Sequence, residues 1–121
     1  MDKSEISIFL EFILESIELI EKRFKKIKSI DDFLTEEGLL ILDAISMRLQ
    51  AIGEALKNID KKDRDFLLQV AEANYWSKII KTREIISHHY INLDAEIVFM
   101  ICDEKLEELK NKIVRLISFV K

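Results

Sequence analysis

The sequence predicts an all-α protein, an antiparallel bundle of four to five helices in one domain that spans residues 1–121. The chain has no proline and only two glycines, so few residues interrupt helices. Apolar residues make up 49% of the chain and charged residues 35%, which argues against disorder. Apolar positions recur at steps of three and four, without the period-two alternation of a strand.

The N-terminal segment is expected to form a helix from about Ser4 to Lys28. Ile8, Phe12 and Leu19 widen its apolar face, and so broad a face usually contacts more than one neighbour or a partner chain. Its main apolar stripe follows the helical repeat at Ile6, Phe9, Ile13, Ile17, Ile20, Phe24 and Ile27.

A second helix is expected to begin near Thr35, with Glu36 and Glu37 at its positive end. Gly53 lies inside this helix, where it costs about 1 kcal/mol relative to alanine, so we expect another helix to cross the bare backbone there. The polar segment 58–64 is expected to be a connection. The inward stripe is Leu42, Ile45, Leu49, Ile52, Leu56 and Ile59.

The remaining segments predict a short helix and two longer ones. Asp65 to Ala73 is expected to be the short helix, with Phe66, Leu67 and Val70 inward and a break near Asn74. A helix from Trp76 to His89 follows. Asn92 or Asp94 is expected to cap a last helix that runs to about Val120. Its seam is Val98, Cys102, Leu106, Leu109, Ile113, Leu116 and Val120.

The charge and cysteine content narrow the function classes. The net charge of −4 argues against a general nucleic-acid binder, so any RNA contact must be local, as at Lys78, Lys81 and Arg83.

A single cysteine, Cys102, excludes an intramolecular disulfide and favours the reducing cytoplasm. We interpret it as a buried apolar residue, because no partner base lies nearby in sequence. Glutamates at helical intervals in the N-terminal helix argue against a membrane span or a signal peptide.

The octapeptide from Arg83 to Tyr90 carries the candidate chemistry. Arginine can stabilise charge on a phosphate and histidine can move a proton, which phosphodiester cleavage without a metal requires. On a straight helix, Arg83 and His88 would differ by about 140° and Arg83 and Tyr90 would align. We therefore expect a second element or a second subunit, related by a two-fold axis, to complete the site.

Simpler interpretations remain open for each of these residues. Arg83 could be an ordinary surface cation, and two histidines near a helix C-terminus could favour the negative end of the dipole. Glu84 and His88 are spaced as two metal ligands, but no further ligand pair accompanies them, so no metal or other cofactor is predicted. No glycine-rich phosphate loop occurs, and Ser87 beside His88 points about 100° away from it on a helix.

Several ordered segments resemble the HepT-like toxin branch of the HEPN ribonuclease superfamily. They are Arg83-x-x-x-x-His88-x-Tyr90, Ile52-Gly53-Glu54-Ala55, Trp76 seven residues before the arginine, and Asn92-Leu93-Asp94 after the tyrosine. The family commonly has Asn or Asp after the arginine, where this chain has Glu84, which stays polar but could pair with Arg83.

The resemblance implies a HEPN-like helical homodimer that acts as the toxin of a toxin–antitoxin pair, a metal-independent endoribonuclease. Arg83 and His88 would then be catalytic, and the RNA 2′-hydroxyl would attack the neighbouring phosphorus. A minimal nucleotidyltransferase antitoxin would transfer AMP to Tyr90. Lys81, His89 and Glu84 are candidate substrate contacts. The alternative is a non-catalytic helical dimer module that binds and positions a nucleotidyltransferase, as the broad apolar first helix and the acidic pI suggest.

Overall fold

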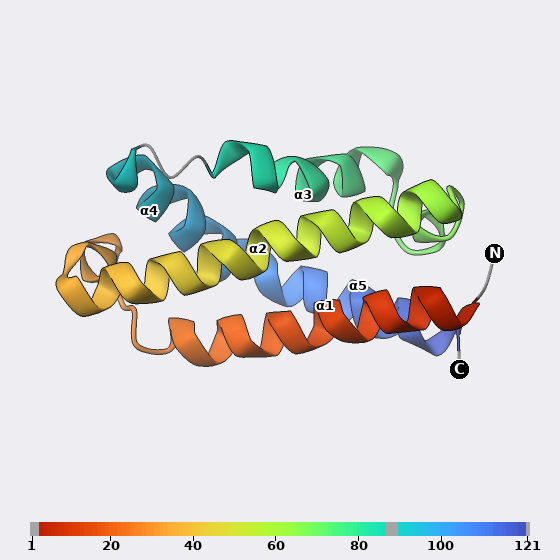
Figure 1. The fold of residues 1–121 in the computed structure, drawn as a ribbon, viewed down its shortest axis with the longest axis horizontal. Coiled ribbons are helices and arrows are strands. Elements are labelled where there is room, and N and C mark those ends of the chain that lie inside the picture. The colour runs from red at the N-terminus through yellow and green to blue at the C-terminus, as the bar shows by residue number, and fades with distance from the viewer. Residues whose placement is uncertain (1–2, 87–89, 121) are drawn as a thin grey trace.

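The computed structural model describes residues 3–86 and 90–120 and confirms the all-α bundle, without a strand in either range. Helix α1 (Lys3–Phe24) lies antiparallel beside α2 (Glu36–Lys62), and α3 (Ala73–Ile85) packs on α2 (Figure 1). Helices α4 (Ile91–Met100) and α5 (Leu106–Ser118) are joined by a π turn, η3 (Ile101–Lys105). The short 3-10 helices η1 (Ile30–Leu34) and η2 (Leu67–Gln69) lie in the connections before α2 and α3.

Helix α2 begins where the sequence predicts. Thr35 is its N-cap, and the threonine Oγ1 accepts a hydrogen bond of 2.9 Å from the Gly38 backbone N–H. The expected connection at 58–64 is mostly wrong, because α2 continues to Lys62. Ile59, which is fully buried, keeps the apolar stripe of α2 against the core for one more turn. Tertiary burial therefore outweighs the polar character of the neighbouring side chains.

The expected first helix and short helix are longer than the observed ones. Helix α1 ends at Phe24, before the Ser29-capped 3-10 helix η1. The segment expected to be helical from Asp65 to Ala73 holds only the single turn η2. Phe66 and Leu67 are nevertheless buried, as the apolar pattern predicts.

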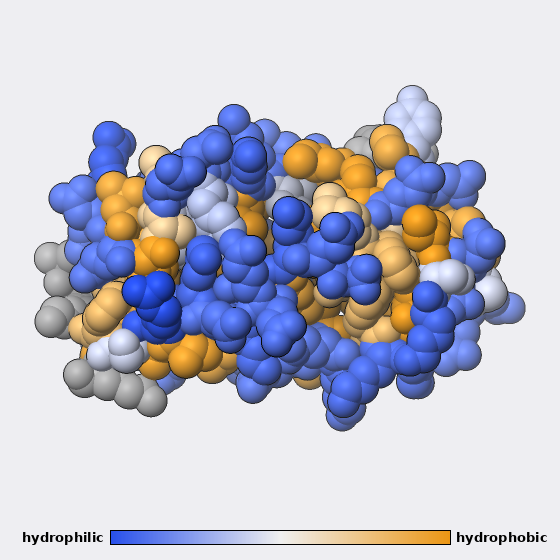
Figure 2. Space-filling model, turned by 180° about the vertical axis from the view of Figure 1, so that it is seen from behind, coloured by the Kyte–Doolittle hydropathy of each residue, from blue (hydrophilic) through white to orange (hydrophobic). Residues whose placement is uncertain are grey.

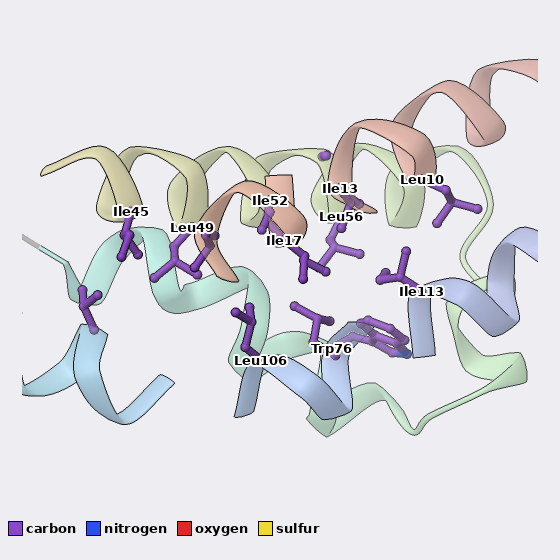
Figure 3. Packing of buried hydrophobic residues seen from close by; sticks show 14 of the residues in the cluster. Leu10, Ile13, Ile17, Ile45, Leu49, Ile52, Leu56, Trp76, Leu106 and Ile113 are labelled. Atoms are coloured by element: carbon purple, nitrogen blue, oxygen red, sulfur yellow. The ribbon is translucent and has the colours of Figure 1, made fainter. Parts of the chain in front are cut away.

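The core lies between α1, α2, α3 and α5 and is built from aliphatic side chains of these helices (Figure 3). Trp76 joins it from α3 and donates an indole N–H hydrogen bond of 2.8 Å to the Leu67 carbonyl. At the other end, Phe24 and Phe99 pack edge to face with ring centroids 5.3 Å apart, beside Phe33. The core is thus one continuous cluster that spans the length of the bundle.

The π turn accounts for the seam of the C-terminal helices. Val98 and Leu106 are both buried, although eight residues of a regular α-helix would turn their side chains about 80° apart. A π turn takes more residues per turn, so it brings both side chains back to the inner face. The predicted seam is confirmed by its buried members Val98, Leu106, Leu109, Ile113 and Leu116, and Cys102 and Val120 pack half-buried against the same core.

Candidate functional site

The motif does not lie on one straight helix. Helix α3 ends at Ile85, and Ile86 is its C-cap with an extended backbone. Tyr90 is the N-cap of α4. The expected helix to His89, the angles calculated along it and the expected cap at Asn92 or Asp94 are therefore wrong. The physical reason is tertiary: buried Ile86 accepts a hydrogen bond of 3.3 Å from the Gln50 side chain of α2, which anchors the chain as it leaves the helix.

Arg83 lies in the last turn of α3, where a cation is favoured by the helix dipole. Its guanidinium Nη1 donates to the Glu54 carboxylate of α2 at 2.6 Å, and the Arg83 side chain is 30% exposed. The Nε atom is enclosed and has no hydrogen-bond acceptor within residues 3–86 and 90–120. Arg83 is thus partly enclosed and oriented by an ion pair from a neighbouring helix.

Gly53 allows α3 to approach α2 closely enough for that ion pair. A Cβ atom at Gly53 would lie 3.1 Å from the Ile80 carbonyl oxygen and 3.6 Å from that of Ile79. This confirms that another helix crosses at the glycine. Glu54, the next residue, pairs with Arg83. Glu54 belongs to the Ile52-Gly53-Glu54-Ala55 segment of the family resemblance, but no pattern in the sequence identifies it as the partner of Arg83.

Lys81, Glu84 and Arg83 line the same groove. It lies between α3 and the C-terminal half of α2, has a volume of about 530 Å³ and opens to solvent. Glu84 is exposed and forms no ion pair within the described part of the chain, so Arg83 pairs with Glu54 and not with Glu84, the partner that the sequence left open. Lys57 and Arg64 line the groove too, although nothing in the sequence connects them with the motif.

The other motif residues are partly described. His88 and His89 lie outside the described residues. The Tyr90 side chain is 70% exposed. Asp94, in the first turn of α4, is almost fully buried and engaged in an interaction. A carboxylate there is favoured by the positive end of the helix.

A second groove of about 510 Å³ lies on the opposite side of α3, towards α4 and α5. Its lining is mostly apolar, from residues such as Ile79, Ile97 and Leu109, with Tyr75 half-buried at its edge. Burial and, secondly, the charge of Glu108 raise the pKa of the Tyr75 phenol to about 12.

The face of the molecule opposite to that of Figure 1 mixes hydrophobic patches with a broad band of hydrophilic side chains (Figure 2).

Cys102 and the acidic residues of the described ranges were also compared with the requirements of a reactive thiol and a metal site. Burial, and to a lesser extent Asp103, raise the pKa of the Cys102 thiol to about 12, which keeps it protonated and unreactive. No three His, Cys, Asp or Glu side chains of the described ranges gather as metal ligands would. None of the helices, as far as they are described, is long and apolar enough to cross a bilayer.

A family model and curated relatives both match most of this chain. The family model described as Ribonuclease HepT-like matches residues 13–116. The chain is 30% identical over 108 residues to "Probable ribonuclease HepT" of Thermococcus cleftensis, an alignment that covers 89% of this chain and 92% of that protein. No solved structure matches the chain at comparable significance.

A longer relative aligns with almost the whole chain. This Methanocaldococcus jannaschii protein is 31% identical over 116 residues, and its name joins gamma-glutamylcyclotransferase to a provisional RNase assignment. The alignment covers 96% of this chain but 49% of that relative, so the chain spans about half its length.

Proposed function

The chain belongs to the HepT-like ribonuclease family, and from this membership we propose that it is a metal-independent endoribonuclease and the toxin of a toxin–antitoxin pair. The placement of Arg83 carries the proposal. This cation is oriented by Glu54, half-enclosed at the end of a helix, and lines a groove that a phosphate can enter. A fixed guanidinium in a partly enclosed site stabilises charge on phosphoryl oxygens better than a freely moving surface cation does.

In the proposed reaction, the RNA 2′-oxygen forms a bond to phosphorus while the bond from phosphorus to the 5′-oxygen breaks. His88 accepts the proton of the 2′-hydroxyl, and a second imidazole, supplied by the other copy of a homodimer, protonates the leaving 5′-oxygen. Arg83 neutralises the charge that develops on the non-bridging oxygens. Lys81 and His89 contact the substrate beside them, and Glu84 lies at the edge of the contact.

Purified protein is expected to cleave single-stranded RNA in the presence of a chelator and to leave 2′,3′-cyclic phosphate ends. The same sequence with 2′-O-methyl groups should remain intact, because it lacks the nucleophile. Gel analysis and mass spectrometry of the fragments measure both results. Cleavage of the methylated RNA, or cleavage that stops with the chelator, would contradict the proposed mechanism.

Tyr90 is the proposed site of control by the antitoxin. The chain has two tyrosines, Tyr75 and Tyr90. Tyr90 is 70% exposed and lies at the start of α4, directly after the segment that follows Arg83 and α3. A phosphate attached there by a nucleotidyltransferase would add negative charge and bulk where a substrate phosphate must approach.

Co-expression with a minimal nucleotidyltransferase antitoxin is expected to add one adenylyl group, seen by intact-mass measurement. Tyr90→Phe should abolish the mass increase. Tyr75→Phe is the matched control and should keep it, because the Tyr75 side chain is half-buried whereas that of Tyr90 is 70% exposed. An adenylyl group that persists in Tyr90→Phe would place the modification on another residue.

A second candidate function is the non-catalytic module that binds and positions a nucleotidyltransferase. Apolar side chains exposed on α1 and α2 favour it, namely Ile8, Leu40 and Met47, which are each about two-thirds exposed. A stable complex with the nucleotidyltransferase, without cleavage of any RNA by the free protein, would favour this candidate over the first.

A further inference from the structure

We infer that the RNA backbone binds in the groove between the C-terminal half of α2 and α3, where Lys57, Arg64 and Lys81 contact its phosphates and lead it to Arg83. RNA as the ligand rests on the proposed function. The position of the strand rests on the geometry and charge of the groove. In the following, this space is called the α2–α3 groove.

Cations approach the α2–α3 groove from both of its walls. Lys57 comes from α2, Arg64 from the segment after α2, and Lys81 and Arg83 from α3. Among the described residues, two carboxylates, Asp60 and Glu84, line the same space, and a third, Glu54, pairs with Arg83 from outside the lining, so the cations still outnumber the carboxylates. The local excess of positive charge is opposite to the net charge of −4 of the whole chain. A polyanion is therefore attracted to this groove rather than to the surface at large.

Three of these cations are available to a ligand, and the fourth, Arg83, is held by Glu54. Lys57, Arg64 and Lys81 form no ion pair within residues 3–86 and 90–120. By contrast, Lys62, on the next turn after Lys57, pairs with Glu5 of α1 at 2.8 Å. Unpaired side chains can contact phosphates without first breaking an internal interaction, which favours binding.

The groove on the other side of α3 has a different character. Lys78 and Lys105 line it together with Glu72 and Glu108, so its charges balance, and the rest of its surface is mostly apolar. Arg83 is absent from that lining and present in the lining of the α2–α3 groove. The structure thus favours the α2–α3 groove, and not the groove on the other side of α3, as the route by which RNA reaches Arg83.

The α2–α3 groove can accommodate several phosphates in sequence. Its lining on α3 extends from Ala73 to Glu84, which corresponds to about 16 Å along a helix. The one aromatic ring that lines it, Trp76, is 3% exposed and offers no face for a base to stack on. Contacts to the backbone position RNA without reading its sequence, so we expect weak sequence preference.

The test measures binding separately from cleavage. Binding of a fluorescent, single-stranded 2′-O-methyl RNA, which cannot be cut by 2′-hydroxyl attack, is followed by anisotropy over a series of salt concentrations. For single strands, the slope of log affinity against log salt falls by about 0.7 for each phosphate contact removed. The double variant Lys57→Gln/Arg64→Gln should therefore lower the slope by about 1.4 and bind more weakly at low salt.

Two double variants with the same change in charge are the controls. Lys61→Gln/Lys25→Gln removes two exposed lysines outside both grooves and should retain the wild-type slope. Lys78→Gln/Lys105→Gln removes the cations of the opposite groove and should also retain it. All six positions are at the surface, and thermal melts confirm that each variant folds.

Each result decides the inference. The inference is supported if the salt slope falls in Lys57→Gln/Arg64→Gln alone. It is overturned if the slope falls equally in all three variants or only in Lys78→Gln/Lys105→Gln. It is also overturned if the wild type does not bind the RNA. The proposed function fails separately if the wild type binds the methylated RNA with the expected slope yet cuts no unmodified RNA.

Discussion

Replacing Arg83 or His88 with alanine is expected to lower the rate of RNA cleavage by at least about 100-fold. Loss of one donor to a developing negative charge costs about 10²–10³ in rate. Loss of a general acid or base costs about 10²–10⁴. Single-turnover assays on a defined RNA would measure the effect. Lys78→Ala is the control that should cleave normally, because Lys78, although grouped with Lys81 and Arg83 in the sequence, lines the groove on the other side of α3.

Glu54 offers a sharper test of the same arrangement, because it orients Arg83 without lining the α2–α3 groove. Glu54→Gln should lower kcat and leave KM for RNA nearly unchanged, and Glu54→Asp should restore part of kcat. The pair is partly exposed, at 30% for Arg83 and 52% for Glu54, so it contributes about 0–1 kcal/mol to folding. Wild-type kcat in Glu54→Gln would contradict a positioning role, and wild-type cleavage by Arg83→Ala would contradict the catalytic assignment itself.

Replacing Trp76 with alanine is expected to lower the free energy of unfolding by about 3–5 kcal/mol. Of the thirteen residues of α3, all of them described, only Trp76 is buried, so it is the main apolar anchor of the helix that carries Arg83. Its indole also satisfies the Leu67 carbonyl at the α2–α3 connection. Urea denaturation followed by circular dichroism would measure the change.

Two further variants separate the contributions of Trp76. Trp76→Phe keeps most of the apolar area but leaves the Leu67 carbonyl without its donor, so a smaller loss of about 1–3 kcal/mol is expected. Leu68 lies in the same connection and its side chain is 45% exposed, so Leu68→Ala should lower the free energy of unfolding by less than either Trp76 variant. A cost for Trp76→Ala no larger than for Leu68→Ala would show that α3 is anchored elsewhere.

The sequence was sufficient to predict the helices whose apolar stripe repeats over many turns. Thr35 marked the start of α2, and Gly53 marked where another helix crosses it, because both residue types have strong local meanings. The end of α3 at Ile85 could not be read in this way. It is associated with a contact between distant residues: the Gln50 side chain of α2 donates a hydrogen bond to the carbonyl of Ile86, thirty-six residues later in the chain.

For the candidate site, too, some residues could be predicted from the sequence and others could not. Arg83 and Glu84 were identified from the motif and Lys81 from its neighbourhood, and the structure brings these three to one groove. The ion pair that Glu84 could have formed with Arg83 is formed instead by Glu54, which is distant in sequence but adjacent in space. Lys57 and Arg64 were missed because their relation to Arg83 arises from the antiparallel course of α2 and α3, which no spacing along the chain encodes.

The π turn between α4 and α5 accommodates one residue more than a regular α-helix with the same inner face would hold. Helix α4 packs against α2 and η1, while α5 lies along α1, and both belong to one continuous helical segment. Deleting one residue of the turn would bring Val98 and Leu106 from eight to seven residues apart, and a regular α-helix turns residues at that spacing to within about 20° of each other. Regular winding would then keep Leu109 and Ile113 on the inner face, against α1. Relatives that lack this one residue should therefore retain the packing of α5, whereas a second deletion would turn it by about 100°.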